Sequence, residues 1–189
     1  MTRTALALLL STAFALAACQ NNGSTGNNDT LVVDNLTVQN ADLGNVPSTA
    51  AVDAPFLTEA MKGDNSEVAL GKIAQSKGSS QGVKDLGTML VTDHGAHKQK
   101  LIDLANSAGI AVPTEPADEG HANLLKLQKL NGTEFDKTFE QMLVDSHHKG
   151  IAKNEKQAAS GDPQTAALAK ATLPVLKKHL ANAEALLKK

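Results

Sequence analysis

The sequence predicts an all-α fold, a bundle of four long helices, and three observations support this prediction. From Asp53 to the end of the chain, apolar residues recur every three or four positions, which is the spacing of one helix face. Capping residues, glycines and prolines interrupt that pattern where helices would start and stop. The interruption after the second long helix is longer than the other two, which predicts a crossover connection between the halves of the bundle.

The first helix is predicted from about Ala54 to Ser76. Asp53 can cap its N-terminus, and Pro55 suits the first turn because that turn has no use for a backbone N–H group. Gly78 is expected to end the helix. Residues at three- and four-residue spacing form the face that is expected to point inward: Phe56, Ala60, Gly63, Glu67, Leu70 and Ala74.

The second helix is predicted to begin after a serine cap, Ser79 or Ser80, and to run to about Ala108, before Gly109. Its apolar face is regular and contains two histidines: Val83, Leu86, Leu90, His94, His97, Leu101, Leu104 and Ala108. A polar side chain on an apolar face needs a partner when it is buried, so this pair of histidines marks a candidate site.

Pro113 and Pro116 break the helical pattern, and a short helix from about Asp118 to Leu130 is predicted inside the crossover. Thr133 is expected to cap a third long helix that reaches about Ser160. The inward face of this helix would contain Phe135, Phe139, Leu143, His147, Gly150, Asn154 and Ala158.

The segment Gly161-Asp162-Pro163 predicts the end of one helix and the start of the last one, with Asp162 as cap and Pro163 in the first turn. The inward face of the last helix would hold Leu168, Leu176, His179 or Leu180, Ala183 and Leu187.

These elements place potential metal ligands at one height in the bundle. A helix rises about 1.5 Å per residue, so counting from the two short turns puts Glu67 level with His94, and His147 level with His179. The crossover makes the second and third long helices parallel, and the two pairs then share one height. Metal sites in bundles are built with a ligand from each helix, so the predicted ligands are Glu67, His94, His97, His147 and His179.

A repeated segment makes the predicted site asymmetric. Met89–His94 reads MLVTDH and Met142–His147 reads MLVDSH, so each copy ends in an inward histidine. Gly150 in the second copy occupies the position that His97 has in the first, and the site should therefore be weighted toward the second helix. Three other polar residues are not expected to bind the metal. Asp93 is expected to orient a ligand, and His121 and His148 are expected to be exposed.

The N-terminus predicts export. An apolar run from Ala5 to Ala18 is shorter than the roughly 20 residues that span a bilayer. It ends in Leu16-Ala17-Ala18-Cys19, which resembles the lipobox of bacterial lipoproteins. The resemblance implies that a signal peptide, residues 1–18, is removed and that Cys19 becomes a lipid anchor on the periplasmic face of the envelope. Gln20 stands where an aspartate would favour the inner membrane, so the outer membrane is the expected destination.

Composition limits the remaining possibilities. Residues 19–53 are polar and rich in Asn, Gly, Ser and Thr, which predicts a flexible tether and leaves residues 54–189 as the bundle domain. Cys19 is the only cysteine, so no disulfide within the chain is possible. The chain has 18 basic and 20 acidic residues, with no basic block and no aromatic platform, which excludes nucleic acid as an expected partner.

From Phe56 to Leu187 the chain resembles a bacterial family known as a domain of unknown function, DUF4142. The resemblance implies an exported protein with a ferritin-like four-helix bundle, and it implies no established activity. The matching segments are Phe56-Leu57, Glu67–Lys72, Met89–His94, Phe135-Asp136 through His147, Leu173–Leu176 and His179-Leu180.

Two better-known kinds of metal site fit this sequence less well. The run His147–Ala152 resembles a second ferritin-like family, in which a helix with paired histidines is associated with copper. The methionines that accompany that helix are largely missing here, and only Met142 is near. Di-iron proteins of the ferritin class use Glu-x-x-His motifs on two helices, and this sequence has none.

Three functional hypotheses follow. The first is a non-enzymatic envelope protein that binds a transition metal ion or another small ligand among its helices, in a role such as envelope stress protection, because neutral imidazole suits zinc, copper, nickel or iron. The second is a structural or interaction module whose histidines pair with carboxylates in the core. The third, ranked last because no nucleophile or cofactor loop is evident, is an enzyme that uses metal-dependent or histidine acid–base chemistry.

Overall fold

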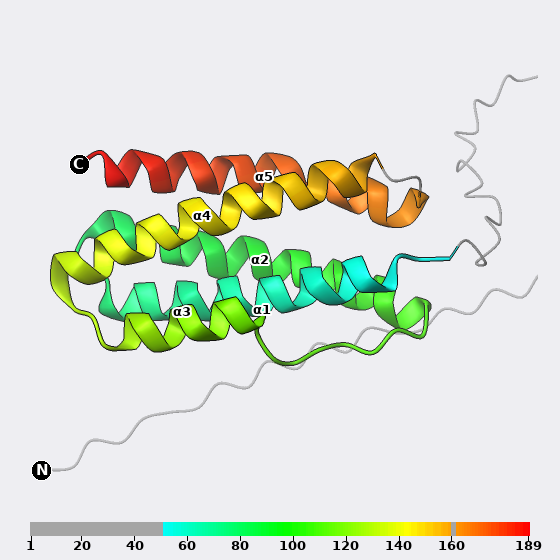
Figure 1. Cartoon of the computed structure of the whole chain (residues 1–189), viewed down its shortest axis with the longest axis horizontal. Helices are drawn as coiled ribbons and strands as arrows, with labels where there is room; N and C mark the ends of the chain where they lie inside the picture. Colours follow the sequence, from blue (N-terminus) through cyan, green and yellow to red (C-terminus); the bar gives the residue numbers. More distant parts are fainter. Residues whose placement is uncertain (1–50, 160–161) are drawn as a thin grey trace, which may run out of the picture. The chain divides into compact units, whose positions relative to one another are not determined.

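Every regular element in the described part of the chain is an α-helix. The computed structural model describes residues 51–159 and 162–189. Its helices are α1 (Ala54–Lys77), α2 (Gln81–Ser107), α3 (Asp118–Gln128), α4 (Gly132–Ala158) and α5 (Pro163–Leu187) (Figure 1). The predicted all-α class is confirmed. The predicted signal peptide, the lipid anchor at Cys19 and nearly all of the tether 19–53 lie outside the described residues.

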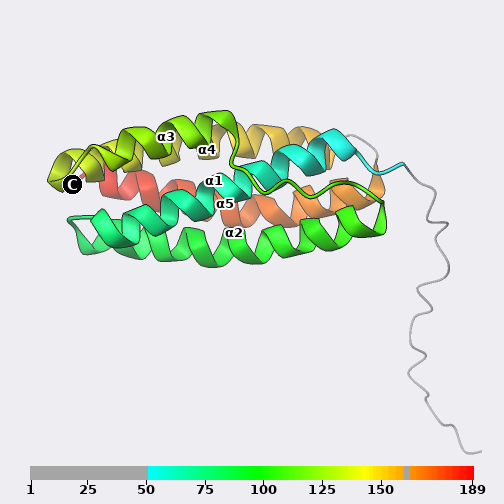
Figure 2. The same ribbon diagram turned by 90° about the horizontal axis from the view of Figure 1, so that it is seen from below.

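Two helix pairs make up the bundle. α1 packs along α2 and α4 packs along α5, while α3 lies against α1 and α4. Figures 1 and 2 show that the long connection after α2 carries the chain back along the bundle, so that α2 and α4 run in the same direction. The predicted crossover is therefore confirmed, and α3 is its short extra helix. None of the described helices combines the length and apolar character that crossing a membrane would require.

Most helix ends follow the predicted capping chemistry. The side chain of Asp53 accepts a hydrogen bond from the backbone N–H of Phe56, Ser80 caps α2 in the same way, and Asp162 caps α5 with Pro163 in its first turn. The predicted cap at Thr133 is wrong. A cap at Thr133 would start the helix at Glu134, but α4 begins two residues earlier, at Gly132, because the backbone carbonyl of Asn131 already accepts from the N–H of Phe135.

The predicted inward face of α1 is correct only in its second half. Leu70 and Ala74 are buried, as expected, but the first half of the helix turns a neighbouring stripe inward. Leu57, Met61 and Asp64 are buried there in place of Phe56, Ala60 and Gly63. One residue corresponds to about 100° of rotation around a helix, so this shift brings the Asp64 carboxylate into the core. Smaller errors occur near the ends of two helices. In α2, Ala105 is buried instead of Ala108, and in α4, Gln157 is buried instead of Asn154 and Ala158.

A polar layer separates two apolar clusters in the core. The larger cluster includes Leu70, Leu90, Phe135, Phe139 and Leu143, and the smaller one contains Leu57, Met61, Leu101 and Ala105. On both α1 and α2 the buried residues between the two clusters are polar. A buried polar group must be hydrogen-bonded or bound to an ion, so this layer is where the structure departs from simple core packing. It contains Asp64, Glu67, His94, His147 and His179.

Candidate metal centre

The structure brings together three of the histidines that the sequence predicted as metal ligands. His94 comes from α2, His147 from α4 and His179 from α5. All three are buried, and one ligand nitrogen from each lies within 4.8 Å of the other two. Their ring centroids are 5.2 to 5.8 Å apart. The remaining predicted ligands, Glu67 and His97, are not part of this group.

The first histidine is oriented by a carboxylate. Nδ1 of His94 donates to Oδ1 of Asp64 at 2.8 Å, and both residues are buried. A carboxylate is an acceptor only, so the proton of a neutral His94 is on Nδ1 and its Nε2 carries a lone pair. That Nε2 is buried and has no hydrogen-bond partner among the described residues.

The other two histidines are held in the same manner. Nδ1 of His147 donates to the backbone carbonyl of Leu143 at 2.9 Å. Nε2 of His179 donates to Oδ2 of Asp93 at 2.9 Å. These acceptors fix one proton on each ring, which leaves lone pairs on His147 Nε2 and His179 Nδ1. These two nitrogens lie 3.2 Å apart, and with the other ring nitrogens protonated neither of them carries a proton to donate.

Three lone pairs therefore converge in one buried place. Two unprotonated nitrogens at hydrogen-bond distance repel each other, and His94 adds a third within reach. Such an arrangement is stable when a cation or an additional proton lies between the nitrogens. An aspartate or backbone carbonyl that fixes the far nitrogen of a histidine, with the near nitrogen left free, is the arrangement found around protein-bound metals.

The electrostatics keep two of these histidines neutral. Burial lowers the pKa of His147, and the nearby His94 lowers it further. Burial also lowers the pKa of His179, to about 4, although its hydrogen bond to Asp93 acts in the opposite direction. For His94, burial alone would lower the pKa, but the Asp64 hydrogen bond and the charge of Glu67 outweigh burial and raise it. A proton would thus be taken up first at His94.

His97 lies outside the group of converging nitrogens and bonds to a carboxylate, as the structural hypothesis expects. Its Nδ1 donates to Oδ2 of Asp64 at 2.8 Å, and its Nε2 lies 2.9 Å from the hydroxyl of Thr172. Both ring nitrogens are therefore engaged. Burial would raise the pKa of Asp64, but its bonds to His94 and His97 outweigh burial and lower it, so the aspartate stays charged. His97 supports the residue that orients His94.

Glu67 lies close to the cluster without belonging to it. Its Oε1 accepts a hydrogen bond from the hydroxyl of Ser146 at 3.0 Å. Its Oε2 is buried and has no hydrogen-bond partner among the described residues. Glu67 and His94 are thus the two residues with an unpaired buried side-chain atom in the described part of the chain.

Asp64, the carboxylate that holds two histidines, is not among the residues predicted from the sequence. The sequence does contain a signal for it, because Leu57, Met61 and Asp64 follow the same three- and four-residue spacing as the predicted inward face of this helix. Asp93, which was expected to orient a ligand, is not part of the cluster and accepts a hydrogen bond from His179. His121 and His148 are exposed, as expected, and His148 is 3.8 Å from Glu184.

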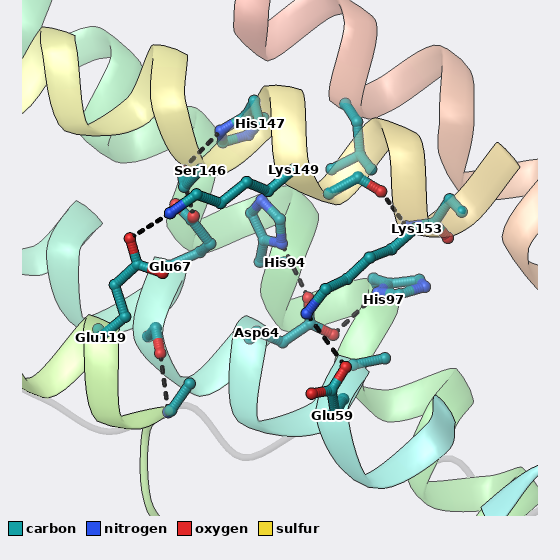
Figure 3. A pocket seen from close by; sticks show the side chains of 18 of the residues that line it. Glu59, Asp64, Glu67, His94, His97, Glu119, Ser146, His147, Lys149 and Lys153 are labelled. Carbon is teal, nitrogen blue, oxygen red and sulfur yellow. Dashed lines mark hydrogen bonds and ion pairs between the residues drawn. The ribbon is translucent and has the colours of Figure 1, made fainter. Parts of the chain in front are cut away.

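A cavity of about 200 Å³ opens beside the cluster. His94, His147, Glu67 and Asp64 line it, as Figure 3 shows, and His179 does not. Its rim carries two ion pairs from α4, which are labelled in Figure 3: Lys149 with Glu119 of α3 at 2.6 Å, and Lys153 with Glu59 of α1 at 3.1 Å. A ligand in the cavity would therefore reach the side of the histidine cluster that lines the cavity, at His94 and His147.

The fold and these contacts define a helical-bundle protein with a buried three-histidine centre beside a cavity. The chain belongs to the family described as "Domain of unknown function (DUF4142)", whose model matches residues 39–186. No curated protein and no solved structure gives a significant match.

Proposed function

We propose that this protein binds one divalent transition metal ion at His94, His147 and His179. The observation that carries the proposal is the convergence of three ring nitrogens whose protons are fixed on the far side of each ring. Three neutral imidazoles form the ligand set of a zinc-type site with an open fourth position. The fourth position would face the cavity, because His94 and His147 line it and His179 lies behind them.

The spacing of the nitrogens supports this assignment. Zinc binds histidine nitrogen at about 2.0–2.1 Å in tetrahedral geometry, so two nitrogens on one ion lie about 3.3 to 3.4 Å apart. His147 Nε2 and His179 Nδ1 are 3.2 Å apart. A small side-chain shift of His94, whose nitrogen lies within 4.8 Å of the others, completes the set.

The donor chemistry favours a zinc site over a copper(I) site and over a di-iron site. Copper(I) sites use soft sulfur ligands, but Met89 accepts a hydrogen bond from Asn182 and Met142 packs against the larger apolar cluster. A di-iron site needs several carboxylates, and Glu67 is the nearest one with an unpaired oxygen.

Zinc titration of the chelator-treated full chain by calorimetry tests the proposal. The expected result is one ion per chain, with affinity reduced at least about hundred-fold by His147→Ala, since loss of an orienting partner alone costs about 10- to 100-fold. His148→Ala is the matched control, because His148 is the next residue of α4 and its side chain is 61% exposed. Its affinity should equal that of the wild type. Zinc binding that survives both His94→Ala and His147→Ala would exclude this site.

A structural role is the second candidate, and the double hydrogen bond to Asp64 favours it. In that case the histidines neutralise a buried carboxylate, and the metal-free protein loses stability when one of them is removed. His94→Ala would cost about 1–3 kcal/mol, because Asp64 keeps only one partner. A wild-type protein that binds no zinc, together with this stability loss, would establish the structural role.

We also propose that the bundle is displayed on the periplasmic face of the bacterial envelope by a lipid on Cys19. The sequence Leu16-Ala17-Ala18-Cys19 supports this location. Removal of excess transition metal from the periplasm would then protect the envelope, in accordance with the role expected from the sequence.

A further inference from the structure

The cavity beside the histidine cluster contains a buried carboxylate oxygen that lacks a donor. Glu67 is 9% exposed, and Ser146 donates to only one of its two oxygens. Oε2 has no hydrogen-bond partner among the described residues. Leaving such an oxygen unpaired is costly, so the cavity is suited to a ligand that supplies an N–H or O–H group.

The charges around the cavity favour a cationic donor. Asp64 and Glu67 both line its interior. The lysines that line it, Lys149 and Lys153, lie at the rim, where each is paired with a glutamate and its side chain is more than half exposed, at 58% and 63%. The rim charges therefore cancel in pairs. Inside, both oxygens of Asp64 are bonded to histidines, and Glu67 is the carboxylate that keeps an unpaired oxygen. Opposite charge at short range stabilises a bound cation.

Part of the remaining wall is apolar and open. Phe56, Ala60, Leu70 and Leu176 line it. Gly63 and Gly150 leave free space, since a Cβ atom on Gly63 would meet nothing within 4 Å and one on Gly150 would meet only Leu176, at 3.7 Å. A cavity of about 150 Å³ holds benzene, so the volume of about 200 Å³ here suits a slightly larger molecule.

We propose that this cavity binds a small organic ammonium ion, whose N–H groups donate to Oε2 of Glu67 while its apolar part lies against Leu70 and Leu176. The three donors of a primary ammonium group suffice for the unpaired oxygen of Glu67. This site is distinct from the zinc proposal, because it needs Glu67 and the cavity but no metal ion.

Benzylammonium is a suitable probe, and chelator-treated full chain is the protein to use. Calorimetry should show one site per chain for benzylammonium, with at least about ten-fold weaker binding of benzyl alcohol and no binding of benzoate, because hydrogen bonds to charged groups are the stronger ones. Equal binding of benzyl alcohol and benzylammonium would exclude the charge-based recognition.

Glu67→Gln tests the contact with the carboxylate. Glutamine keeps the oxygen that accepts from Ser146 but replaces the free oxygen with a donor, so affinity for benzylammonium should fall about 10- to 100-fold. Glu140→Gln is the matched control, because Glu140 is another buried glutamate of the bundle, 6% exposed, and does not line the cavity. Equal losses in the two variants would contradict the assignment to Glu67.

Gly63→Leu tests the cavity without changing any polar group. Leucine favours helix more than glycine does, and its side chain would project into the open space next to Gly63. Benzylammonium binding should be abolished. Gly95→Leu is the control, since Gly95 of α2 also has nothing within 4 Å of its Cβ position and does not line the cavity. Unchanged binding in Gly63→Leu would mean that benzylammonium binds outside the cavity, and no binding to the wild type would exclude the proposed site.

Discussion

Oδ1 of Asp64 lies 2.8 Å from Nδ1 of His94, and this hydrogen bond determines which nitrogen of His94 can bind a metal ion. The other oxygen of the same carboxylate accepts from His97. Asp64 thus orients His94, and its own position is fixed by the hydrogen bond from His97. Its position on α1, three residues before Glu67, allows both carboxylates to lie in the polar layer.

Asp64→Asn should weaken zinc binding about 10- to 100-fold, the usual effect of losing an orienting partner. The amide group presents a donor to one of the two histidines, so His94 or His97 must change its protonation or turn its ring. Zinc calorimetry measures the effect. Asp145→Asn on the exposed side of α4 is the control and should leave affinity unchanged. An Asp64→Asn affinity equal to that of the wild type would show that the aspartate has no orienting role.

The free energy of unfolding should depend on pH through Asp136. This buried carboxylate accepts from the N–H and hydroxyl of Ser79 and from the N–H of Ser80, at 2.7 to 2.8 Å. Burial would raise its pKa, but these hydrogen bonds outweigh burial and lower it. A lowered folded-state pKa gives stability above the ordinary value of about 3.9, which is lost as the pH falls through the folded-state pKa.

Urea unfolding of wild type and Asp136→Asn checks this linkage. At neutral pH the variant should be about 1–3 kcal/mol less stable, because donors at the start of α2 lose a charged acceptor. Between about pH 5 and 3, a range around the ordinary aspartate pKa, the wild type should lose stability faster than the variant. The difference in stability between the two proteins should therefore shrink. Parallel curves over this range would contradict a role for the Asp136 charge.

Two glycines of α1 should respond in opposite ways to alanine. A Cβ atom on Gly71 would lie 2.6 Å from the backbone carbonyl oxygen of Gly87, so Gly71→Ala should force α1 and α2 apart and cost about 1–3 kcal/mol. Gly63 has free space at the same atom, so Gly63→Ala should stabilise the protein by about 0.5–1 kcal/mol through helix propensity. Thermal unfolding of both variants gives the comparison. A stabilised Gly71→Ala would disprove the close approach of the two helices.

Cys19→Ala should release the protein from the membrane fraction of a bacterial host. The lipobox prediction requires acylation of this cysteine, and acyl chains hold a protein by burying methylene groups, at about 0.8 kcal/mol each. Fractionation followed by mass determination measures both localisation and the acyl modification. Ser24→Ala, in the segment predicted as tether, is a control that should stay with the membrane. Unaltered fractionation of Cys19→Ala would remove the basis for a lipid anchor.

The sequence predicted the histidine cluster better than the carboxylates around it. His94, His147 and His179 could be found because regular helix spacing and two short turns fix the height of a residue in a bundle. Asp64 was missed because the rotation of α1 decides which of two neighbouring stripes faces the core. Leu57 and Met61 face inward on α1, and Asp64 follows them.

The hydrogen bonds around the histidines required the folded structure. Asp93 and His179 are 86 residues apart in the chain, and Asp64 and His94 are 30 apart. No local pattern links such pairs, because their contact depends on the rotation and spacing of different helices.

The sequence by itself determined that the described domain is all-α, where most helices begin and end, and that three histidines share one level of the bundle. These properties depend on local capping, apolar spacing and the constant rise of a helix. Only the tertiary structure decided which nitrogen of each histidine is free, which carboxylate orients it, and that Glu67 lies at a cavity with one oxygen unpaired. Those properties depend on distances of about 3 Å between side chains of different helices, and only the packed arrangement of the helices sets them.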